Sequence, residues 1–272
     1  MSTPTVSICI PVYNGAKYLA ATLDSVCTQS HPALQVVITV DRADDGSWEI
    51  IQAAREKYSE REFVIEKNPE RLGMAGNWNR SVDLATGDFI KVMGQDDLLE
   101  PRCIAAQLEF LQGHPECMLV ASACKIVRHD GRFIMARRRF AEGIVLSGSE
   151  ILRRCLETSA NLVGEPVTVL TRAQAYSECR FDPKFEYYTD LDLWLRIIGD
   201  QSVGFMDSPL CSFRVHRTAC SWGQQGRAYD EFLQLEAGYP DTALRGNARR
   251  GIRWLRGQAL IFARTSFYRI FG

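Results

Sequence analysis

Carboxylates gather at three points of the chain, and each group follows an apolar segment. The groups are Asp41 with Asp44 and Asp45, Asp96 with Asp97, and Asp190 with Asp192. Like charges held together at the ends of strands are costly unless a cation or a reacting hydroxyl needs them. The pattern therefore predicts chemistry that involves a metal ion, a proton transfer or both.

Asp96 and Asp97 are the strongest candidates for metal binding. They follow an apolar run that ends at Met93 and precede Pro101, which we predict to begin a helix. A loop that offers one or two carboxylates and leaves the other positions to phosphates and water is typical of Mg²⁺ or Mn²⁺ sites. The alternative is an ordinary turn, in which aspartate is common.

Asp190 and Asp192 lie at the start of a predicted helix over residues 190–198 and point in different directions. Asp190 is either a helix cap or a general base at the mouth of a pocket. Asp192 and Arg196 have the i,i+4 spacing of a structural ion pair. His216 ends a predicted strand and is either an ordinary histidine or a further ligand for a metal ion bound to a diphosphate.

Asp41 follows the second apolar strand, where its carboxylate can accept hydrogen bonds from a ring N–H or a hydroxyl group of a ligand. Asp45 and Ser47 stand at the start of the next predicted helix and could cap it instead.

Strands and helices alternate at short spacing through the first 115 residues, which predicts a parallel sheet with helices on both faces. Ligands bind such sheets beyond the carboxyl ends of the strands, where Pro11–Asn14, Asp41 and Asp96 fall. We predict strands over residues 6–12, where Pro11 ends the ladder, 34–40, 63–66 and 88–93, and helices over 16–28, 47–58 and 74–85.

The second half of the chain is less regular. The hydrophobic pattern predicts strands over 118–128, 132–135, 167–170, 203–206 and 210–215. We therefore expect one domain over residues 1–222, with a regular half over 1–115 and a less regular half over 116–222. A helical extension over 223–272 would follow.

The composition of the chain argues against several classes of protein. The chain has 272 residues, is 46% hydrophobic and carries a formal net charge of −1, so we expect no nucleic acid partner. Its nine cysteines are scattered singly, which suits free thiols in a reducing cytoplasm rather than disulfides or zinc. We see no signal peptide and no window of about 20 residues apolar enough to cross a bilayer.

The last stretch of the chain is basic and aromatic. Between Thr242 and Gly272 there are seven arginines and no acidic residue, and Trp254 and Phe262 are among the aromatic residues between them. A helix of this kind could lie on an anionic membrane surface near a lipid-linked acceptor. The alternative is a helix that packs its aromatic face on the domain and leaves its arginines in water.

Several motifs follow one another in a fixed order between residues 5 and 222. They are Val6–Gly15, Asp45–Ile51, Leu72–Asn79, Ala85–Ile90, Phe181–Asp182, Asp190–Arg196 and Arg214–His216. In this order they resemble family 2 glycosyltransferases with the GT-A fold. The resemblance implies an α/β, Rossmann-like, mostly parallel sheet flanked by helices, with a C-terminal helical tail. It also implies transfer of a sugar from a nucleotide sugar, by family frequency a UDP-sugar. The half over 1–115 would then bind the nucleotide sugar, and the half over 116–222 would bind the acceptor.

The resemblance also implies roles for residues. Asp41 would bind the uracil or ribose, Asp96 would ligate Mn²⁺ or Mg²⁺, and Asp190 would be the catalytic base. His216 and Asp97 would be further metal contacts. The residues that would contact the nucleotide sugar are Pro11, Val12, Tyr13, Asn14, Asp41, Asn77, Gln95 and Asp96.

Two positions depart from the family pattern. Gly94 stands where many members have the first Asp of D-x-D, which would shift contacts to Gln95 or Asp97, and Thr189 stands where Glu is frequent. One base and one stabilised leaving group suffice for a single displacement with inversion.

Three other functions fit these residues less well than glycosyl transfer. A non-catalytic nucleotide-sugar-binding module remains an alternative. A nucleotidyltransferase would need a glycine-rich basic loop after the first strand, and a glycosidase would usually need a carboxylate pair.

Overall fold

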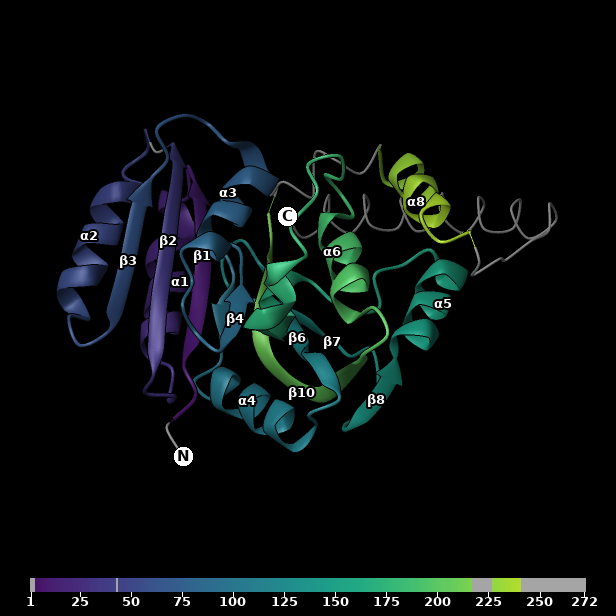
Figure 1. Ribbon diagram of the computed structural model, residues 1–272. Coiled ribbons are helices and arrows are strands. Elements are labelled where there is room, and N and C mark those ends of the chain that lie inside the picture. The colour runs from purple at the N-terminus through teal and green to yellow at the C-terminus, as the bar shows by residue number, and fades with distance from the viewer. Residues whose placement is uncertain (1–2, 43, 217–226, 241–272) are drawn as a thin grey trace.

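The computed structural model describes residues 3–42, 44–216 and 227–240. They form one ten-stranded sheet with the order β3-β2-β1-β4-β9-β6-β10-β5, in which β7 also pairs with β6 and β8 with β10. Helices cover both faces of this sheet (Figure 1). The predicted α/β class is confirmed. The basic segment over 242–272 lies outside the described residues.

The first part of the sheet is parallel. It consists of β1 (Val6–Tyr13), β2 (Leu34–Arg42), β3 (Glu62–Lys67) and β4 (Phe89–Val92), joined by α1 (Ala16–Cys27), α2 (Ser47–Lys57) and α3 (Gly73–Asp83). Side chains alternate between the faces of a strand, so Ile8 and Ile10 pack with α1 and α2 while Cys9 packs with α3. Both faces of β1, β2 and β4 are buried, which explains why β1 and β2 read as continuous apolar runs.

The second part of the sheet is mixed. Only β6 and β10 are parallel to each other there; β5, β7, β8 and β9 pair antiparallel with their neighbours. The elements are β5 (Leu98–Leu99), α4 (Cys103–Gly113), β6 (Cys117–Arg128), β7 (Phe133–Arg137), β8 (Ile144–Ser147), α5 (Gly148–Thr158), the 3₁₀ turns η1 (Pro166–Thr168) and η2 (Ala173–Ser177), β9 (Val169–Arg172), α6 (Thr189–Ile198), β10 (Ser202–Val215) and α8 (Ala228–Ala237).

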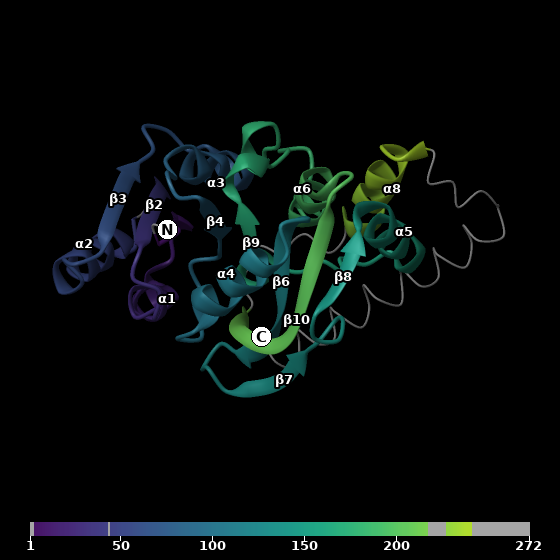
Figure 2. The same cartoon turned by 60° about the horizontal axis from the view of Figure 1, so that its bottom comes forward.

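Prolines account for three differences from the predicted elements. Pro11 does not end the first strand, because β1 continues to Tyr13 with Pro11 beside Thr39. Pro101 precedes its helix, which begins at Cys103. The two strands expected over 203–215 are one, β10, whose register shifts around Pro209 and absorbs the missing N–H in a bulge. Figure 2 shows β10 as one long strand beside β6.

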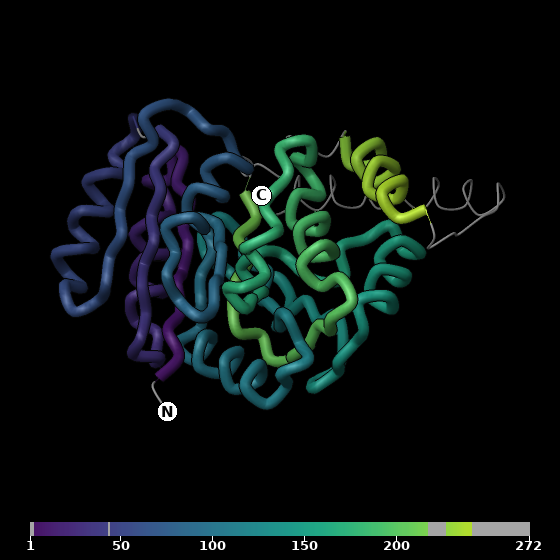
Figure 3. Tube along the Cα trace, in the orientation of Figure 1, coloured from purple at the N-terminus to yellow at the C-terminus, as the bar shows by residue number. Residues whose placement is uncertain are grey.

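Helix α8 packs on the second half of the domain, next to α6 (Figure 3). Its Ala228, Phe232 and Leu235 are buried in the same apolar cluster as Leu191 and Trp194 of α6. In the described ranges, no helix combines the length and hydropathy needed to span a membrane. The eight cysteines of those ranges are free thiols.

Candidate active site

The end of β1 is held by Gln95. Its side-chain Oε1 accepts from the Tyr13 N–H at 2.9 Å, and its Nε2 donates to the Tyr13 carbonyl at 2.9 Å. Pro11 and Val12 are buried in the strand, whereas Tyr13 and Asn14 are exposed. The guanidinium of Arg71, which the sequence did not single out, lies 4.3 Å from the Tyr13 ring centroid. Tyr13 therefore presents a fixed aromatic ring at the carboxyl edge of the sheet.

Asp41 holds the loop that enters α3. Its Oδ1 accepts from the Leu72 N–H at 2.6 Å and Asn68 Nδ2 at 3.2 Å, and its Oδ2 accepts from the Gly73 N–H at 3.0 Å. Only 4% of Asp41 is exposed. The structure thus gives this carboxylate backbone partners, and its contact with a uracil or ribose stays a prediction.

Asp45 and Asn77 also form hydrogen bonds with main-chain groups. Asp45 accepts from Ser47 and from the Ala16 N–H, so it fixes the starts of α1 and α2, as the capping alternative predicted. Asn77 is buried, and its Nδ2 donates to the carbonyl groups of Val12 and Thr39.

Asp96 and His216 form the polar pair at the centre of this edge. Asp96 Oδ2 lies 2.6 Å from His216 Nε2, and the two side chains are 23% and 8% exposed. The neighbouring Tyr18 ring lies 4.8 Å from the His216 ring. The predicted proximity of residues 96 and 216, which are 120 positions apart, is thus present in the structure.

Gly94 allows this conformation of Asp96. A Cβ at position 94 would lie 2.6 Å from Asp96 Oδ1 and 3.3 Å from Asp97 Oδ2. The residue that departs from D-x-D therefore leaves room for the two carboxylates that follow it.

Asp97 faces the interior instead of the edge. It is 5% exposed, and its Oδ1 accepts from the Arg214 N–H at 3.0 Å. Burial, then the Asp96 charge and to a smaller extent Glu165, raise the pKa of the Asp97 carboxyl well above its ordinary value. Arg214, a residue to which the sequence gave no role, also donates through Nε to the Asp96 carbonyl.

A divalent cation would find Asp96 and His216 as ligands. A carboxylate and an imidazole fit Mn²⁺, which readily takes its remaining ligands from phosphates and water. Within the described part of the chain, no cluster of three or more His, Cys, Asp or Glu side chains is arranged to hold a metal ion. The role of Asp97 as a ligand stays a prediction.

Asp190 lies in the first turn of α6 and contacts Asn161. Its Oδ2 accepts from Asn161 Nδ2 at 3.0 Å, and its Oδ1 accepts from the Leu191 N–H at 2.7 Å. Asn161 is itself fixed by two hydrogen bonds to Gly164, whose carbonyl also accepts from Trp194 Nε1. The expected Asp192–Arg196 ion pair is present at 2.5 Å, so the two aspartates of this helix have separate partners.

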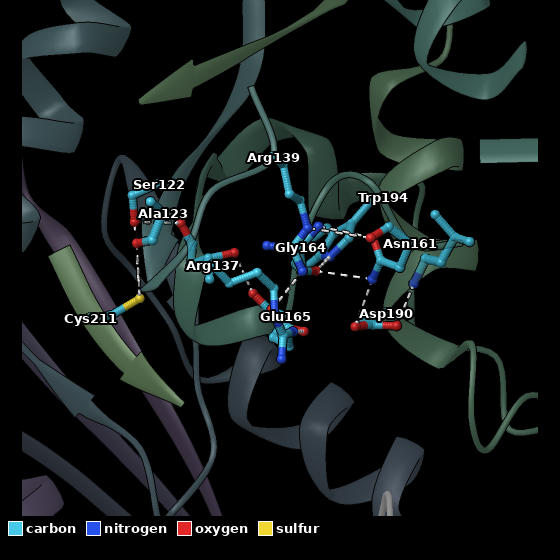
Figure 4. A network of polar contacts seen from close by, with 12 residues as sticks. Ser122, Ala123, Arg137, Arg139, Asn161, Gly164, Glu165, Asp190, Trp194 and Cys211 are labelled. Atoms are coloured by element: carbon cyan, nitrogen blue, oxygen red, sulfur yellow. Dashed lines mark hydrogen bonds and ion pairs between the residues drawn. The ribbon is translucent and has the colours of Figure 1, made fainter. Parts of the chain in front are cut away.

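A partly buried ion-pair network lies beside Asp190 (Figure 4). Glu165 pairs with Arg139 at 2.8 Å and with Arg137. Burial alone would raise the pKa of Glu165, but the two guanidinium groups outweigh it and hold that pKa well below its ordinary value. The Asp190 charge acts on Arg139 as well. The Glu165 charge in turn acts on Asp97.

The sequence did not single out Asn161, Glu165 or Arg139. The only local signal was the run of three arginines at 137–139, and such a run more often lies in water than in a core. Arg137 and Arg139 pair with Glu165, and Arg138 pairs with Asp207, which no spacing rule connects to them.

The chain matches a known protein family. The model of the family described as glycosyl transferase family 2 matches residues 7–177, more than half of the chain. The chain belongs to glycosyltransferase family 2.

Two curated relatives of this glycosyltransferase are also named glycosyltransferases. The putative glycosyltransferase EpsE of Bacillus subtilis is 27% identical over 210 residues, which are 75% of this chain and 70% of EpsE. The amylovoran biosynthesis glycosyltransferase AmsB of Erwinia amylovora is 27% identical over 202 residues, 72% of this chain and 64% of AmsB.

Solved structures confirm the GT-A fold of this glycosyltransferase. TarS 1–349 of S. aureus in complex with UDP superposes with a TM-score of 0.68 at 18% identity, covering 90% of this chain and 68% of TarS 1–349. The mannosyltransferase PcManGT of Pyrobaculum calidifontis, in complex with GDP-Man and Mn²⁺, gives a TM-score of 0.63 at 16% identity, covering 98% of this chain and 72% of PcManGT.

Proposed function

We propose that this family 2 glycosyltransferase moves a sugar from a nucleotide sugar, most simply a UDP-sugar, to an acceptor hydroxyl with inversion at the anomeric carbon. The observation that carries the proposal is the contact between Asp96 and His216 at 2.6 Å, together with the network through Glu165 and Arg139 toward Asp190. In this proposal Asp96 and His216 would act on the leaving group, and Asp190 would be the base.

Asp190 takes the proton in this mechanism. The acceptor oxygen attacks the anomeric carbon as its proton passes to the Asp190 carboxylate, and the bond from that carbon to the diphosphate oxygen breaks. Asn161 orients the carboxylate through its hydrogen bond to Oδ2. Since a single carboxylate acts, one displacement occurs and the configuration inverts.

Asp96 and His216 act on the leaving group, which is the nucleoside diphosphate. They would hold Mn²⁺ or Mg²⁺ against the diphosphate, and the cation, when bound, supplies charge neutralisation as the nucleoside diphosphate departs. The exposed Tyr13 ring, fixed by Gln95, offers a stacking surface for the base.

The acceptor is a lipid-linked glycan in this proposal. Support comes from the name of the relative AmsB, which refers to biosynthesis of amylovoran, and from the basic aromatic segment over 242–272. That segment would hold the enzyme at the cytoplasmic membrane surface. Co-sedimentation with anionic liposomes should weaken when residues 241–272 are deleted, and equal binding by both proteins would contradict this part.

Turnover of nucleotide sugars tests the reaction. UDP-, dTDP- and GDP-sugars are incubated with Mn²⁺, with and without glycan acceptors, and release of the nucleoside diphosphate is measured. We expect release that requires the cation, rises with acceptor and falls at least tenfold in Asp96→Asn. NMR of the product should show the inverted anomer. Binding of a nucleotide sugar without any release would favour the non-catalytic module instead.

A further inference from the structure

Helix α8 places a buried carboxylate against the segment that precedes the proposed catalytic base. Glu231 is only 5% exposed. Its Oε1 accepts from the Glu186 N–H at 3.1 Å, and its Oε2 accepts from the N–H groups of Tyr187 at 2.8 Å and Tyr188 at 3.0 Å. Three consecutive backbone donors therefore converge on one side chain that comes from more than 40 residues further along the chain.

The position of Glu231 follows from the way α8 packs. Ala228, Phe232 and Leu235 are the buried apolar residues of the helix, and Glu231 lies three residues after the first and four before the last. It therefore lies within the apolar stripe. A carboxylate there is costly unless hydrogen bonds replace its water, and the three N–H groups do so.

Neighbouring contacts keep the two segments together. The Phe232 and Tyr188 rings lie 5.8 Å apart, and Arg227 forms an ion pair with Glu186 at 2.7 Å. Tyr188 also donates through its hydroxyl to the Ser159 carbonyl at 3.2 Å. The segment over 186–188 is thus fixed from α8 and from the end of α5.

These three N–H groups lead directly into α6, which begins at Thr189. Donors near a helix start have no partner within the helix, and an anion placed on them is stabilised by the helix dipole. Asp190 is two residues beyond Tyr188. Any shift of the segment over 186–188 therefore moves the carboxylate that the proposed mechanism uses.

We infer that Glu231 is a positioning residue for Asp190, so that α8 sets the geometry of proton transfer without touching the substrate. This inference rests on the proposed function, in which Asp190 is the base. Proton transfer and attack depend steeply on geometry, and a displacement of about 1 Å can cost roughly a hundredfold in rate. Donor binding, at the edge formed by β1 and β4, depends on other residues.

The experiment compares four variants of the full-length chain. In Glu231→Gln one oxygen becomes an NH₂ group, which cannot accept from the N–H groups that it faces. We expect kcat to fall about tenfold to a hundredfold, while KM for the donor that turns over and the Kd of UDP stay within about twofold. Asp230→Asn, the same change at the adjacent exposed position of α8, should behave as wild type. Asp190→Asn and the double variant with Glu231→Gln complete the set.

The double variant separates positioning from a general effect on folding. If Glu231 acts through Asp190, adding Glu231→Gln to Asp190→Asn should cause no further loss. Hydrogen exchange adds a readout that needs no substrate, since the amides of 186–188 should exchange faster in Glu231→Gln than in Asp230→Asn.

Three results would overturn the inference: wild-type kcat in Glu231→Gln, multiplicative losses in the double variant, or a Kd for UDP that weakens as much as kcat falls. Wild-type turnover in Asp190→Asn would refute the proposed base, and the role of Glu231 with it. An inactive Asp190→Asn beside an active Glu231→Gln would refute the present inference alone.

Discussion

The nucleotide edge and the surroundings of Asp190 use their polar side chains differently. At the edge formed by β1, β2 and α3, Asp41, Asp45 and Gln95 each bind main-chain groups of the first 100 residues. Around Asp190, side chains bind one another: Asn161 contacts Asp190, and Glu165 pairs with arginines on a separate segment. In the first region side chains hold the backbone, whereas the second region adds contacts between side chains to its main-chain hydrogen bonds.

This difference implies different consequences of mutation. A side chain that only holds backbone contributes mainly to the free energy of unfolding. A side chain in the Asp190 network affects the orientation or charge of a reacting group, so its loss should appear in turnover, in pH dependence or in both.

The largest effect is expected for Asp190→Asn. An amide cannot accept the proton, so kcat should fall by at least a hundredfold, within the range of about 10²–10⁴ for general bases. The free energy of unfolding should fall by only about 1 kcal/mol, because Asn keeps one acceptor oxygen and loses either the bond from Asn161 or the bond from the Leu191 N–H. Steady-state turnover and urea unfolding measure the two quantities. An unchanged kcat would remove the base from the mechanism.

Glu165→Gln should be costly for stability. The change leaves Arg137 and Arg139 without their anion. Breaking a fully buried ion pair costs about 3–5 kcal/mol, and because these two side chains are 32% and 10% exposed, the low end of that range applies. We expect the free energy of unfolding to fall by about 3 kcal/mol in urea titrations at pH 7. Glu157→Gln is the control, since Glu157 pairs with Arg153 at the surface, where about 0.5 kcal/mol is typical. If both variants lost the same free energy of unfolding, the ion pairs of Glu165 would stabilise the fold no more than a surface pair does.

The effect of Glu165 should depend on pH in a defined direction. Its pKa in the folded chain lies below the ordinary value, so its contribution is complete above the unfolded pKa of about 4.3 and is lost as pH falls toward the folded pKa. The stability difference between wild type and Glu165→Gln should therefore be constant from about pH 6 to 8 and shrink below about pH 4.3. A difference that grows on acidification would contradict the direction of the shift.

Asp41→Ala tests the nucleotide edge and should have a smaller effect. It removes an acceptor from Leu72, Gly73 and Asn68, and leaving buried donors unsatisfied costs about 1–3 kcal/mol. We expect a loss of about 2 kcal/mol, with kcat retained within about threefold at a temperature where the variant is folded. Asp44→Ala, which removes an exposed pair with Arg42, should cost less than about 0.5 kcal/mol. Stability unchanged with UDP affinity reduced more than tenfold would instead make Asp41 a ligand residue.

The sequence predicted the first half of the fold because its signals are local. Apolar runs such as Val6–Val12 and Leu34–Val40 are buried on both faces, and each is followed by a helix within a few residues. Asp96 and His216 were found because each ends a strand of that sheet, and strand ends meet at one edge.

The remainder could not be predicted because its partners are distant in sequence. Glu165 finds its arginines more than 25 residues earlier, and Glu231 finds its donors more than 40 residues earlier. No periodicity links such positions, and a carboxylate inside the apolar stripe of α8 reads as a break in the pattern. β8 and α5 were missed because the exposed residues of that region dilute the apolar signal.

Strand β10 connects the helix that carries Asp190 with the position of His216. It begins shortly after the helix that carries Asp190 and continues for 14 residues to Val215, next to His216, with β6 alongside for nearly its whole length. In the proposed mechanism, this pairing with β6 would fix the position of His216 within the sheet. An insertion in β10 would shift its register against β6 and thereby displace His216 relative to Asp96.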